Sequence, residues 1–307
     1  MIVTLTMNPA VDKSTSVEAM IPEKKLRCRE VLVEAGGGGI NVSKGLRKLN
    51  GDSIAVFPSG GNNGKLLESF LGDLQIKFQT VPVKGETRES FTVNEEKTGA
   101  QYRFVLPGAS LDENDIRRCI ELIQTMTPAP QVLVASGSLP PGVGDDFFQR
   151  LANASKKMGA KFIIDSSGKP LQLAVQEGVY LLKPNLSELC TLVGKTHLEL
   201  DEVDDAAKSI INKGNCEVIV VSMGPSGALL VTKDMCKHIP APTVRKQTTV
   251  GAGDSMVAGM VFKLNAGADL LDMVRFGIAC GTAATMNRGT QLFNPEDAMK
   301  LYSWLKR

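Results

Sequence analysis

The chain has 307 residues, of which 43% are hydrophobic and 22% are charged, and its 35 basic and 33 acidic residues leave a net charge of only +2. This composition is typical of a water-soluble globular protein with one or two domains. There is no run of basic residues, and only 5% of the residues are aromatic. Both facts argue against binding to nucleic acids or to a membrane surface.

The sequence also lacks targeting and metal-binding signals. The first residues, MIVTLTMNPAVDK, have neither the basic nor the apolar region of a signal peptide, and no window is apolar over a membrane-spanning length. The six cysteines include no CxxC pair, and there are only two histidines. A zinc site or a disulfide framework is therefore not expected, and the sequence predicts a reduced, cytoplasmic protein.

Short apolar runs rich in β-formers alternate with segments of helical periodicity. Strands are expected at 2–7, 53–58, 132–136, 162–165, 180–183 and 218–222. Helices are expected at 40–50, 62–73, 112–125, 145–158, 168–176, 201–213, 253–266, 270–286 and 295–306. This alternation predicts an α/β fold with a mostly parallel sheet covered on both faces. Ligands of such sheets bind beyond the carboxyl ends of the strands, where Ser136, Asp165 and Ser222 lie.

Two regions interrupt this alternation, at about 13–35 and 86–106. Within the second, the segments 90–94 and 101–105 flank a Glu-Lys-Thr-Gly turn and predict a hairpin. We expect both regions to form a small separate sheet that acts as a lid. Since no linker or repeat is present, the whole chain, 1–307, is expected to be a single domain that carries this lid.

Four consecutive glycines, Gly36 to Gly39, precede a predicted helix that begins with Ile40 and Asn41. The spacing is not that of a dinucleotide-binding fingerprint, and no Walker A motif occurs in the chain. A flexible turn is one interpretation. Close approach of the backbone to another group is favoured, because glycines at a helix start otherwise cost conformational entropy.

The segment TVGAGDSM (249–256) also leads into a predicted helix. Small residues at a helix start leave free N–H groups that bind anions, yet Asp254 would repel a phosphate there. Asp254 has two explanations. It is an acidic residue that the helix dipole stabilises at the helix start, or it is a general base that takes a proton from an attacking hydroxyl group. The second interpretation also explains Gly251 and Gly253, because their backbone stabilises a transferred phosphoryl group.

Two further positions admit a structural and a functional interpretation. Asn185 and Glu188 in KPNLSE (183–188) have the spacing of a capping box, or they hold Mg²⁺ largely through water. Asp12, just past the first strand, is a turn residue or a ligand of sugar hydroxyls, and nothing local decides between these.

Basic residues gather in the predicted lid. They are Lys24, Lys25, Arg27, Arg29, Arg88 and Arg103. Any one of them fits a solvated strand face, but together they favour a phosphorylated ligand.

In their order and spacing, several of these segments resemble the PfkB family of ribokinase-like carbohydrate kinases, over essentially the whole chain. The segments are NPAVD (8–12), GGGGIN (36–41), SGSLPPG (136–142), DSSG (165–168), KPNLSE, SMGPSGA (222–228) and TVGAGDSM. The resemblance implies a three-layer α/β/α sandwich with a β-sheet lid.

The resemblance also implies roles for individual residues. It gives Asp254 as catalytic base and Gly251, Ala252 and Gly253 as an anion hole. It gives Asn185 and Glu188 as the residues that organise Mg²⁺, and Lys183, Asn185, Ser222, Gly224, Gly227 and Thr249 on the nucleotide side. It gives Asp12, Gly37, Gly38 and Asn41 as sugar-binding positions, and Lys25, Arg27, Arg88, Arg103 and Ser138 for the substrate phosphate.

The activity expected from this resemblance is ATP-dependent phosphorylation of fructose 6-phosphate to fructose 1,6-bisphosphate. Tagatose 6-phosphate or fructose 1-phosphate as substrate is the alternative, and a non-catalytic sugar-phosphate sensor is a second one. A nicotinamide-dependent dehydrogenase is disfavoured by the missing fingerprint. Similar kinases use ATP and Mg²⁺, some use K⁺, and they form homodimers through the lid; Thr248 departs from the family signature near the cation position.

Overall fold

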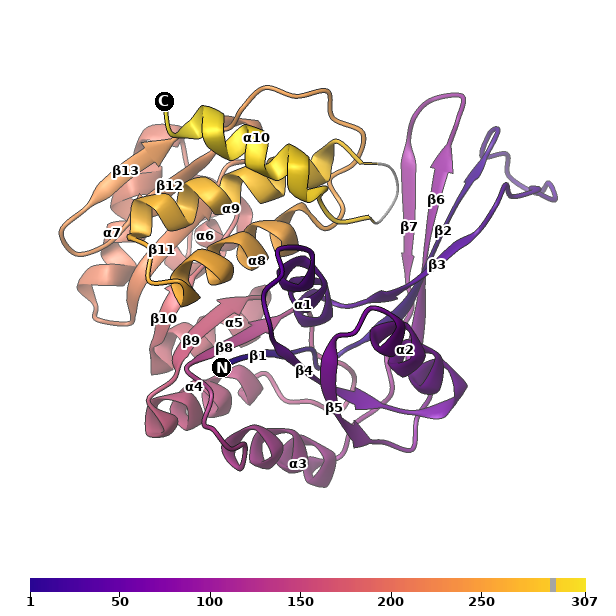
Figure 1. The fold of residues 1–307 in the computed structure, drawn as a ribbon, viewed down its shortest axis with the longest axis horizontal. Helices are drawn as coiled ribbons and strands as arrows, with labels where there is room; N and C mark the ends of the chain where they lie inside the picture. Colours follow the sequence, from indigo (N-terminus) through magenta and orange to yellow (C-terminus); the bar gives the residue numbers. More distant parts are fainter. Residues whose placement is uncertain (288–290) are drawn as a thin grey trace.

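The computed structural model describes residues 1–287 and 291–307, which form two β-sheets and the helices around them (Figure 1). In the described part, the larger sheet has nine strands in the order β13-β12-β11-β10-β9-β8-β1-β4-β5. These strands are β1 (Ile2–Leu5), β4 (Ile54–Ser59), β5 (Lys77–Pro82), β8 (Val132–Ser136), β9 (Lys161–Asp165), β10 (Val179–Leu182), β11 (Cys216–Ser222), β12 (Ala228–Val231) and β13 (Cys236–Ile239). Neighbouring strands from β5 to β11 are parallel, whereas β12 is antiparallel to both of its neighbours.

Helices cover both faces of this sheet. On one face lie α3 (Glu113–Gln124), α4 (Phe147–Met158), α5 (Gly168–Glu177), α6 (Leu186–Val193) and α7 (Val203–Asn212). On the other face lie α1 (Gly38–Lys48), α8 (Ala252–Asn265), α9 (Leu270–Thr285) and α10 (Pro295–Leu305). Side chains of β8 alternate between the two cores: Val132 and Val134 pack with α8 and α9, and Leu133 packs on the opposite side. This alternation follows from the two-residue period of a strand.

A second, four-stranded sheet projects from one side of the molecule, as Figure 1 shows. Its strand order is β3 (Leu32–Gly36), β2 (Ala10–Val17), β6 (Arg88–Glu95) and β7 (Gln101–Val105). Helix α2 (Gly61–Asp73) packs between the two sheets, where Leu67 and Leu71 contact Val11 and Phe57. The second sheet is thus attached to the first through a small apolar core at its inner end.

The α/β/α sandwich, the mostly parallel sheet and the separate small sheet are confirmed. All six strands expected in the large sheet are present, as is the hairpin of β6 and β7. Three strands escaped sequence analysis, namely β5, β12 and β13. β5 and β13 are edge strands with mostly exposed or half-exposed residues, and such strands have a weak hydrophobic pattern. β12 is a short buried run that follows β11 after a single turn.

No helix among residues 1–287 and 291–307 is long and apolar enough to cross a membrane. All six cysteines are free thiols; four are buried, while Cys28 and Cys236 are exposed.

Candidate active site

Asp254 lies in the first turn of α8, beyond the carboxyl ends of the central strands. Its Oδ2 accepts a hydrogen bond of 2.9 Å from Nδ2 of Asn41, in the first turn of α1. Its Oδ1 accepts a hydrogen bond of 3.2 Å from the hydroxyl group of Ser136, the last residue of β8. Three elements that are distant in sequence therefore fix one carboxylate. Asn41 was expected as a sugar-binding residue and not as a partner of Asp254, whereas the prediction that the ends of strands carry functional groups included Ser136.

The environment of Asp254 raises its pKa to about 6. Burial is the main cause, because it disfavours the charged form, and the negative charge of Asp165 adds to it. The hydrogen bonds from Asn41 and Ser136 and the charge of Lys183 act in the opposite direction. At neutral pH the carboxylate is ionised, and it is a stronger base than an ordinary aspartate, as a general base requires.

This pKa predicts how activity depends on pH. A general base must be deprotonated, so kcat/KM for the accepting substrate should be constant above the pKa of about 6 and fall below it. The decrease should approach about tenfold per pH unit, as expected for one titrating group. Initial rates between pH 4.5 and 8.5 test this, with stability measured at each pH. A profile that is flat down to pH 5 would contradict the role of Asp254.

The turn before α8 exposes backbone donors beside Asp254. Gly251 caps the helix with φ 74°, a left-handed conformation that favours glycine. The first N–H groups of a helix have no acceptor within it, and Ala252 and Gly253 occupy those positions. A Cβ atom on Gly253 would lie 3.6 Å from Nζ of Lys183 and 3.7 Å from Oδ2 of Asp165, so this turn faces an ammonium group together with its carboxylate partner. The backbone donors and Lys183 are the groups here that suit an anion.

Lys183 forms an ion pair with Asp165, with 3.1 Å between Nζ and Oδ1 and side chains only 6% and 15% exposed. Burial by itself would lower the pKa of Lys183, but the charge and hydrogen bond of Asp165, with Glu188 and Asp254 nearby, raise it above the usual value. The lysine is therefore charged. Asp165 was not assigned a role from the sequence, although it ends a predicted strand, which was the available signal.

Asn185 and Glu188 form a capping box at the start of α6. Oδ1 of Asn185 accepts from the backbone N–H of Glu188 at 2.9 Å, and Oε2 of Glu188 accepts from the backbone N–H of Asn185 at 2.8 Å. The structural interpretation is thus confirmed. Burial, with Asp165 nearby, raises the pKa of Glu188. Among the described residues, no group of three or more His, Cys, Asp or Glu could enclose a metal ion. These donors fit Mg²⁺, which usually keeps several waters and binds to one or two carboxylates and substrate phosphates.

The other nucleotide-side candidates surround this capping box. Ser222 pairs with Asn185 in an isolated parallel bridge, and its N–H donates to the carbonyl oxygen of Pro184 at 2.8 Å. Gly224 and Gly227 bound the turn that follows β11, and a Cβ on Gly227 would lie 2.1 Å from the carbonyl oxygen of Ile239.

Thr249 and Thr248 precede the turn of α8. Thr249 is exposed, and its carbonyl oxygen accepts weakly from the N–H of Ala252 at 3.4 Å. Thr248 is buried, and its hydroxyl group accepts from the N–H of Val250 at 3.1 Å. Both residues therefore shape the approach to α8.

The tetraglycine segment packs against the ends of β1 and β8. A Cβ on Gly37, whose φ is 114°, would lie 2.6 Å from Cγ2 of Thr6, and one on Gly38 would lie 2.3 Å from Oγ of Ser136. A Cβ on Gly36 would overlap the carboxylate of Asp12 at 2.0 Å. Close approach, the favoured interpretation of the glycines, is therefore correct, and it joins Asp12, Ser136 and Asp254 in one region.

Asp12 lies on β2, opposite Glu34 of β3 and Ser90 of β6. Burial raises its pKa, and the positive charges of Lys44, Arg88 and Arg103 act against that shift. The small sheet thus brings two carboxylates, Asp12 and Glu34, together with several cations, which suits a ligand with both hydroxyl and phosphate groups.

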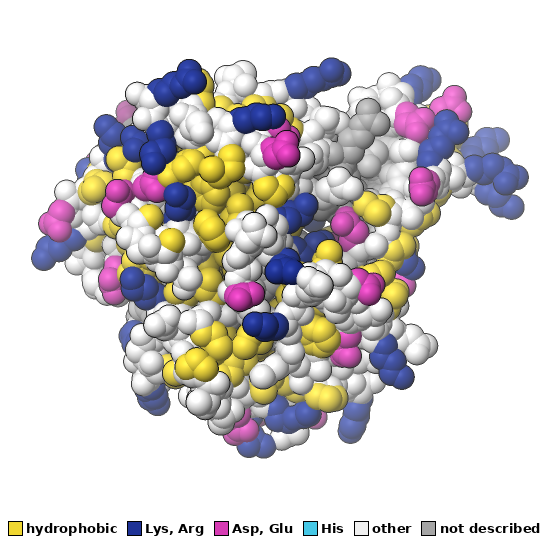
Figure 2. All heavy atoms as spheres, viewed as in Figure 1, with side chains coloured by type: hydrophobic (Ala, Val, Ile, Leu, Met, Phe, Trp, Pro, Cys, Tyr) yellow, Lys and Arg dark blue, Asp and Glu magenta, His cyan; other side chains and the backbone are white. Residues whose placement is uncertain are grey.

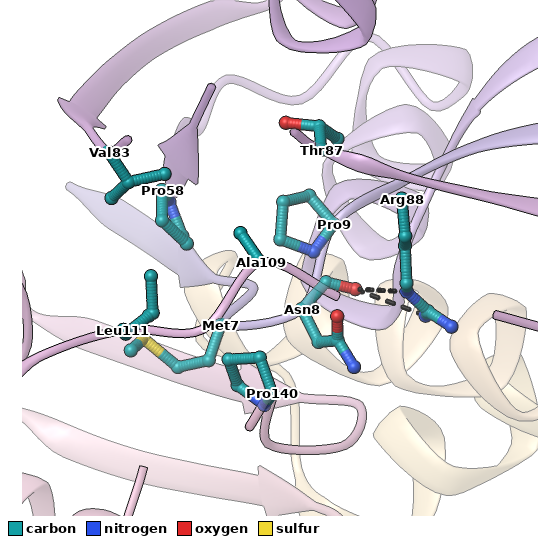
Figure 3. Close-up of a pocket in the computed structure, with 10 residues that line it drawn as sticks. All are labelled: Met7, Asn8, Pro9, Pro58, Val83, Thr87, Arg88, Ala109, Leu111 and Pro140. Atoms are coloured by element: carbon teal, nitrogen blue, oxygen red, sulfur yellow. Dashed lines mark hydrogen bonds between the residues drawn. The ribbon is translucent and has the colours of Figure 1, made fainter. Parts of the chain in front are cut away.

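Arg88 and Ser138 both contact Asn8, which lies between β1 and β2; Figure 3 shows Asn8 and Arg88. Nε and Nη2 of Arg88 donate to the carbonyl oxygen of Asn8 at 3.2 and 3.1 Å, and Nδ2 of Asn8 donates to the hydroxyl group of Ser138 at 3.2 Å. The cavity behind them, between Met7 and Pro140, has a volume of about 10 Å³. It has room for about one water molecule, so a sugar phosphate cannot bind inside it.

Lys25 and Arg27 lie apart from the other candidates. They are exposed in the connection between β2 and β3, which Figure 1 places at the outer end of the small sheet. Figure 2 shows Lys and Arg side chains gathered at this end. One copy of the chain does not bring these two residues to Asp254.

Comparison with protein families decides the classification. The model of the pfkB family carbohydrate kinases matches residues 1–297. The chain belongs to this family. The kinase is 44% identical to the ATP-dependent 6-phosphofructokinase isozyme 2 of Escherichia coli, over 100% of this chain and 99% of the relative. It is 42% identical to the isozyme 2 of Mycobacterium tuberculosis, over 98% and 88% of the two chains. It is 30% identical to the 1-phosphofructokinase of Bacillus subtilis, over 95% and 96%.

Solved structures agree with this classification. The phosphofructokinase-2 of Escherichia coli, crystallised in complex with substrates and products, superimposes with a TM-score of 0.95 at 44% identity, covering 100% of this kinase and 99% of that chain. The ribokinase of Arabidopsis thaliana, at 20% identity and a TM-score of 0.78, shares the fold. The kinase is therefore an ATP-dependent sugar kinase with a ribokinase-like fold.

Proposed function

We propose that this kinase transfers the γ-phosphoryl group of ATP to the C1 hydroxyl group of fructose 6-phosphate and forms fructose 1,6-bisphosphate. The observation that carries the proposal is the position of Asp254, a carboxylate with a pKa of about 6 beside the first backbone N–H groups of α8. The choice of sugar is supported by identities of 42–44% to relatives named 6-phosphofructokinase, against 30% to one named 1-phosphofructokinase.

In the proposed reaction, the C1 oxygen attacks the γ-phosphorus and its proton moves to Asp254. The bond between the γ-phosphorus and the bridging oxygen breaks, and ADP leaves with that electron pair. Asn41 and Ser136 hold the carboxylate in place through both oxygens. The backbone N–H groups of Gly251–Asp254 stabilise the negative charge on the transferred group.

The nucleotide side of the proposal uses the ends of β10 and β11. Lys183, kept charged by Asp165, contributes a cation beside Gly253, and Ser222, Gly224, Gly227 and Thr249 border the nucleotide. Asn185 and Glu188 would hold Mg²⁺ largely through water. When bound, the ion neutralises charge on the phosphates. A K⁺ ion near the nucleotide belongs to the proposal as well, supported by a structure of the Escherichia coli relative in complex with potassium.

The sugar side uses the small sheet as a lid, formed by about 13–35 and 86–106. Asp12, Gly37, Gly38 and Asn41 bind hydroxyl groups, and Arg88, Arg103 and Ser138 bind the phosphate. Closure of the lid would exclude water and limit hydrolysis of ATP.

The lid is also the proposed interface of a homodimer. Its apolar side chains are unusually exposed, including Val31, Phe104 and Val105 at 49%, 48% and 63%. Exposed apolar surface of this kind marks an interaction site. A second copy would also bring Lys25 and Arg27 to a sugar phosphate, which one copy does not. The Escherichia coli relative is described in a tetrameric inhibited form, so a dimer is not the only assembly to test.

The free thiols support a location in the cytoplasm.

The proposal is tested by titrating three acceptors with MgATP and coupling ADP release to a detectable reaction. Fructose 6-phosphate should give the highest kcat/KM, followed by tagatose 6-phosphate and fructose 1-phosphate. If another acceptor is preferred, the mechanism stands and the substrate assignment is wrong. If none is phosphorylated, single-turnover consumption of ATP distinguishes a slow kinase from a sugar-phosphate sensor.

A further inference from the structure

Lys44 is a buried lysine that the proposed chemistry leaves without a role. It lies on α1, three residues after Asn41, and is 9% exposed. Its Nζ donates to the carbonyl oxygen of Ala35 at 2.8 Å and lies 3.8 Å from Oε1 of Glu34. A buried ammonium group is costly, since desolvation disfavours its charge. Methionine would fill the same volume without that cost.

The partners of Lys44 lie next to the carboxylate that is proposed to bind the sugar. Glu34 is opposite Asp12 in the sheet, and Ala35 precedes Gly36, over which the Asp12 side chain lies. The hydrogen bond from Nζ of Lys44 to the carbonyl oxygen of Ala35 therefore joins α1 to β3, the strand that pairs with Asp12. Through Asn41 the same helix also holds Asp254.

We propose that Lys44 is a positioning residue for Asp12: its ammonium group fixes the end of β3 beneath the carboxylate and supplies a buried positive charge in its surroundings. This inference rests on the proposed function, because it assigns Asp12 to sugar binding. The charged groups that face Asp12 are Lys44 from α1, Arg88 from β6, Arg103 from β7 and Glu34 from β3. Lys44 acts most strongly among the three cations in keeping Asp12 ionised.

The test replaces Lys44 in the full-length kinase and separates binding from chemistry. In Lys44→Met, KM for fructose 6-phosphate should rise at least about tenfold, the size of one charged hydrogen bond, while kcat and KM for ATP change little. Because the Asp12 pKa should rise without the cation that most opposes the effect of burial, the acid limb of kcat/KM for the sugar should move to higher pH. The acid limb of the pH profile of kcat should move less, because in the enzyme–substrate complex the bound sugar already interacts with Asp12.

Two further variants control for structure. Lys44→Arg keeps the charge and should restore most of the sugar affinity. Lys48→Met removes an exposed lysine one turn later on the same helix and should leave every parameter unchanged. If Lys44→Met does not fold, Lys44→Gln, which keeps a donor and loses the charge, carries the test. The inference is overturned if a folded, neutral variant at position 44 keeps the wild-type KM and pH profile.

A measurement without turnover separates this inference from the proposed function. The Asp12 carboxyl carbon can be titrated by NMR, with Asp12→Asn for assignment. Its pKa should be higher in Lys44→Met than in the wild type, whatever substrate the kinase uses. An unchanged pKa would exclude the electrostatic role even in an active kinase, whereas a raised pKa in a protein that phosphorylates no sugar would leave only the proposed function wrong.

Discussion

Asp254→Asn is expected to lower kcat by about 10²–10⁴-fold, the usual contribution of a general base. KM for ATP and for the sugar phosphate should change much less, because asparagine has the same shape. Its one amide oxygen can still accept from Asn41, and its NH2 group can donate to the hydroxyl oxygen of Ser136. The proton of the attacking hydroxyl group then has no acceptor. Steady-state kinetics at pH 7.5, above the pKa of about 6 in the wild type, measure the loss.

The matched control is Asp52→Asn. Asp52 is 82% exposed and its nearest cation, Lys77, is 4.0 Å away. Removing this surface charge should leave kcat unchanged and alter stability by less than about 1 kcal/mol. If Asp254→Asn kept its kcat within about tenfold of the wild type, the assignment of Asp254 as base would be wrong.

Gly38→Ala is expected to reduce kcat/KM by about 10²-fold, the effect of moving a reacting group by about 1 Å. The added methyl group would lie 2.3 Å from Oγ and 2.6 Å from the carbonyl carbon of Ser136. One of these contacts is to backbone, so α1 and the end of β8 must separate. Ser136 and Asn41 would then no longer hold Asp254 together. Kinetics and thermal unfolding of the same preparation measure the effect.

Gly72→Ala is the control for this substitution. Gly72 lies within α2, and a Cβ there would meet no atom within 4 Å. Because alanine is a better helix former, the protein should gain up to about 1 kcal/mol in stability and keep its activity. Equal losses of activity in both variants would mean that close packing at Gly38 is not what the site needs.

The fold was predictable because its strands and helices carry strong local patterns. The residues of β8 and β11 form nearly continuous apolar runs, which are typical of central strands in a sheet that is covered on both faces. The edges were harder to predict. β12 and β13 follow a turn without a helix between them, so they lack the alternation from which the rest of the sheet was inferred.

The candidate site was predictable where a motif restricts the backbone. Glycines at 37 and 38 indicated close approach, and the structure shows what approaches. The Asn185–Glu188 spacing indicated a helix cap, and both hydrogen bonds are present. Partnerships between distant residues were not predictable. Nothing beside Lys183 in the sequence identifies Asp165 as its partner, because Asp165 ends β9 and Lys183 directly follows the neighbouring strand β10.

The support of Asp254 also has a consequence for how activity is acquired during folding. Its two hydrogen-bond donors, Asn41 and Ser136, are 213 and 118 residues away along the chain. Contacts of such high sequence separation form late, because the entropy of closing long loops is lost before the contacts compensate for it. No N-terminal fragment that ends before α8 can hold the complete constellation. On the proposed role of Asp254, a nascent chain should therefore not phosphorylate sugar before α8 (Ala252–Asn265) has been synthesised.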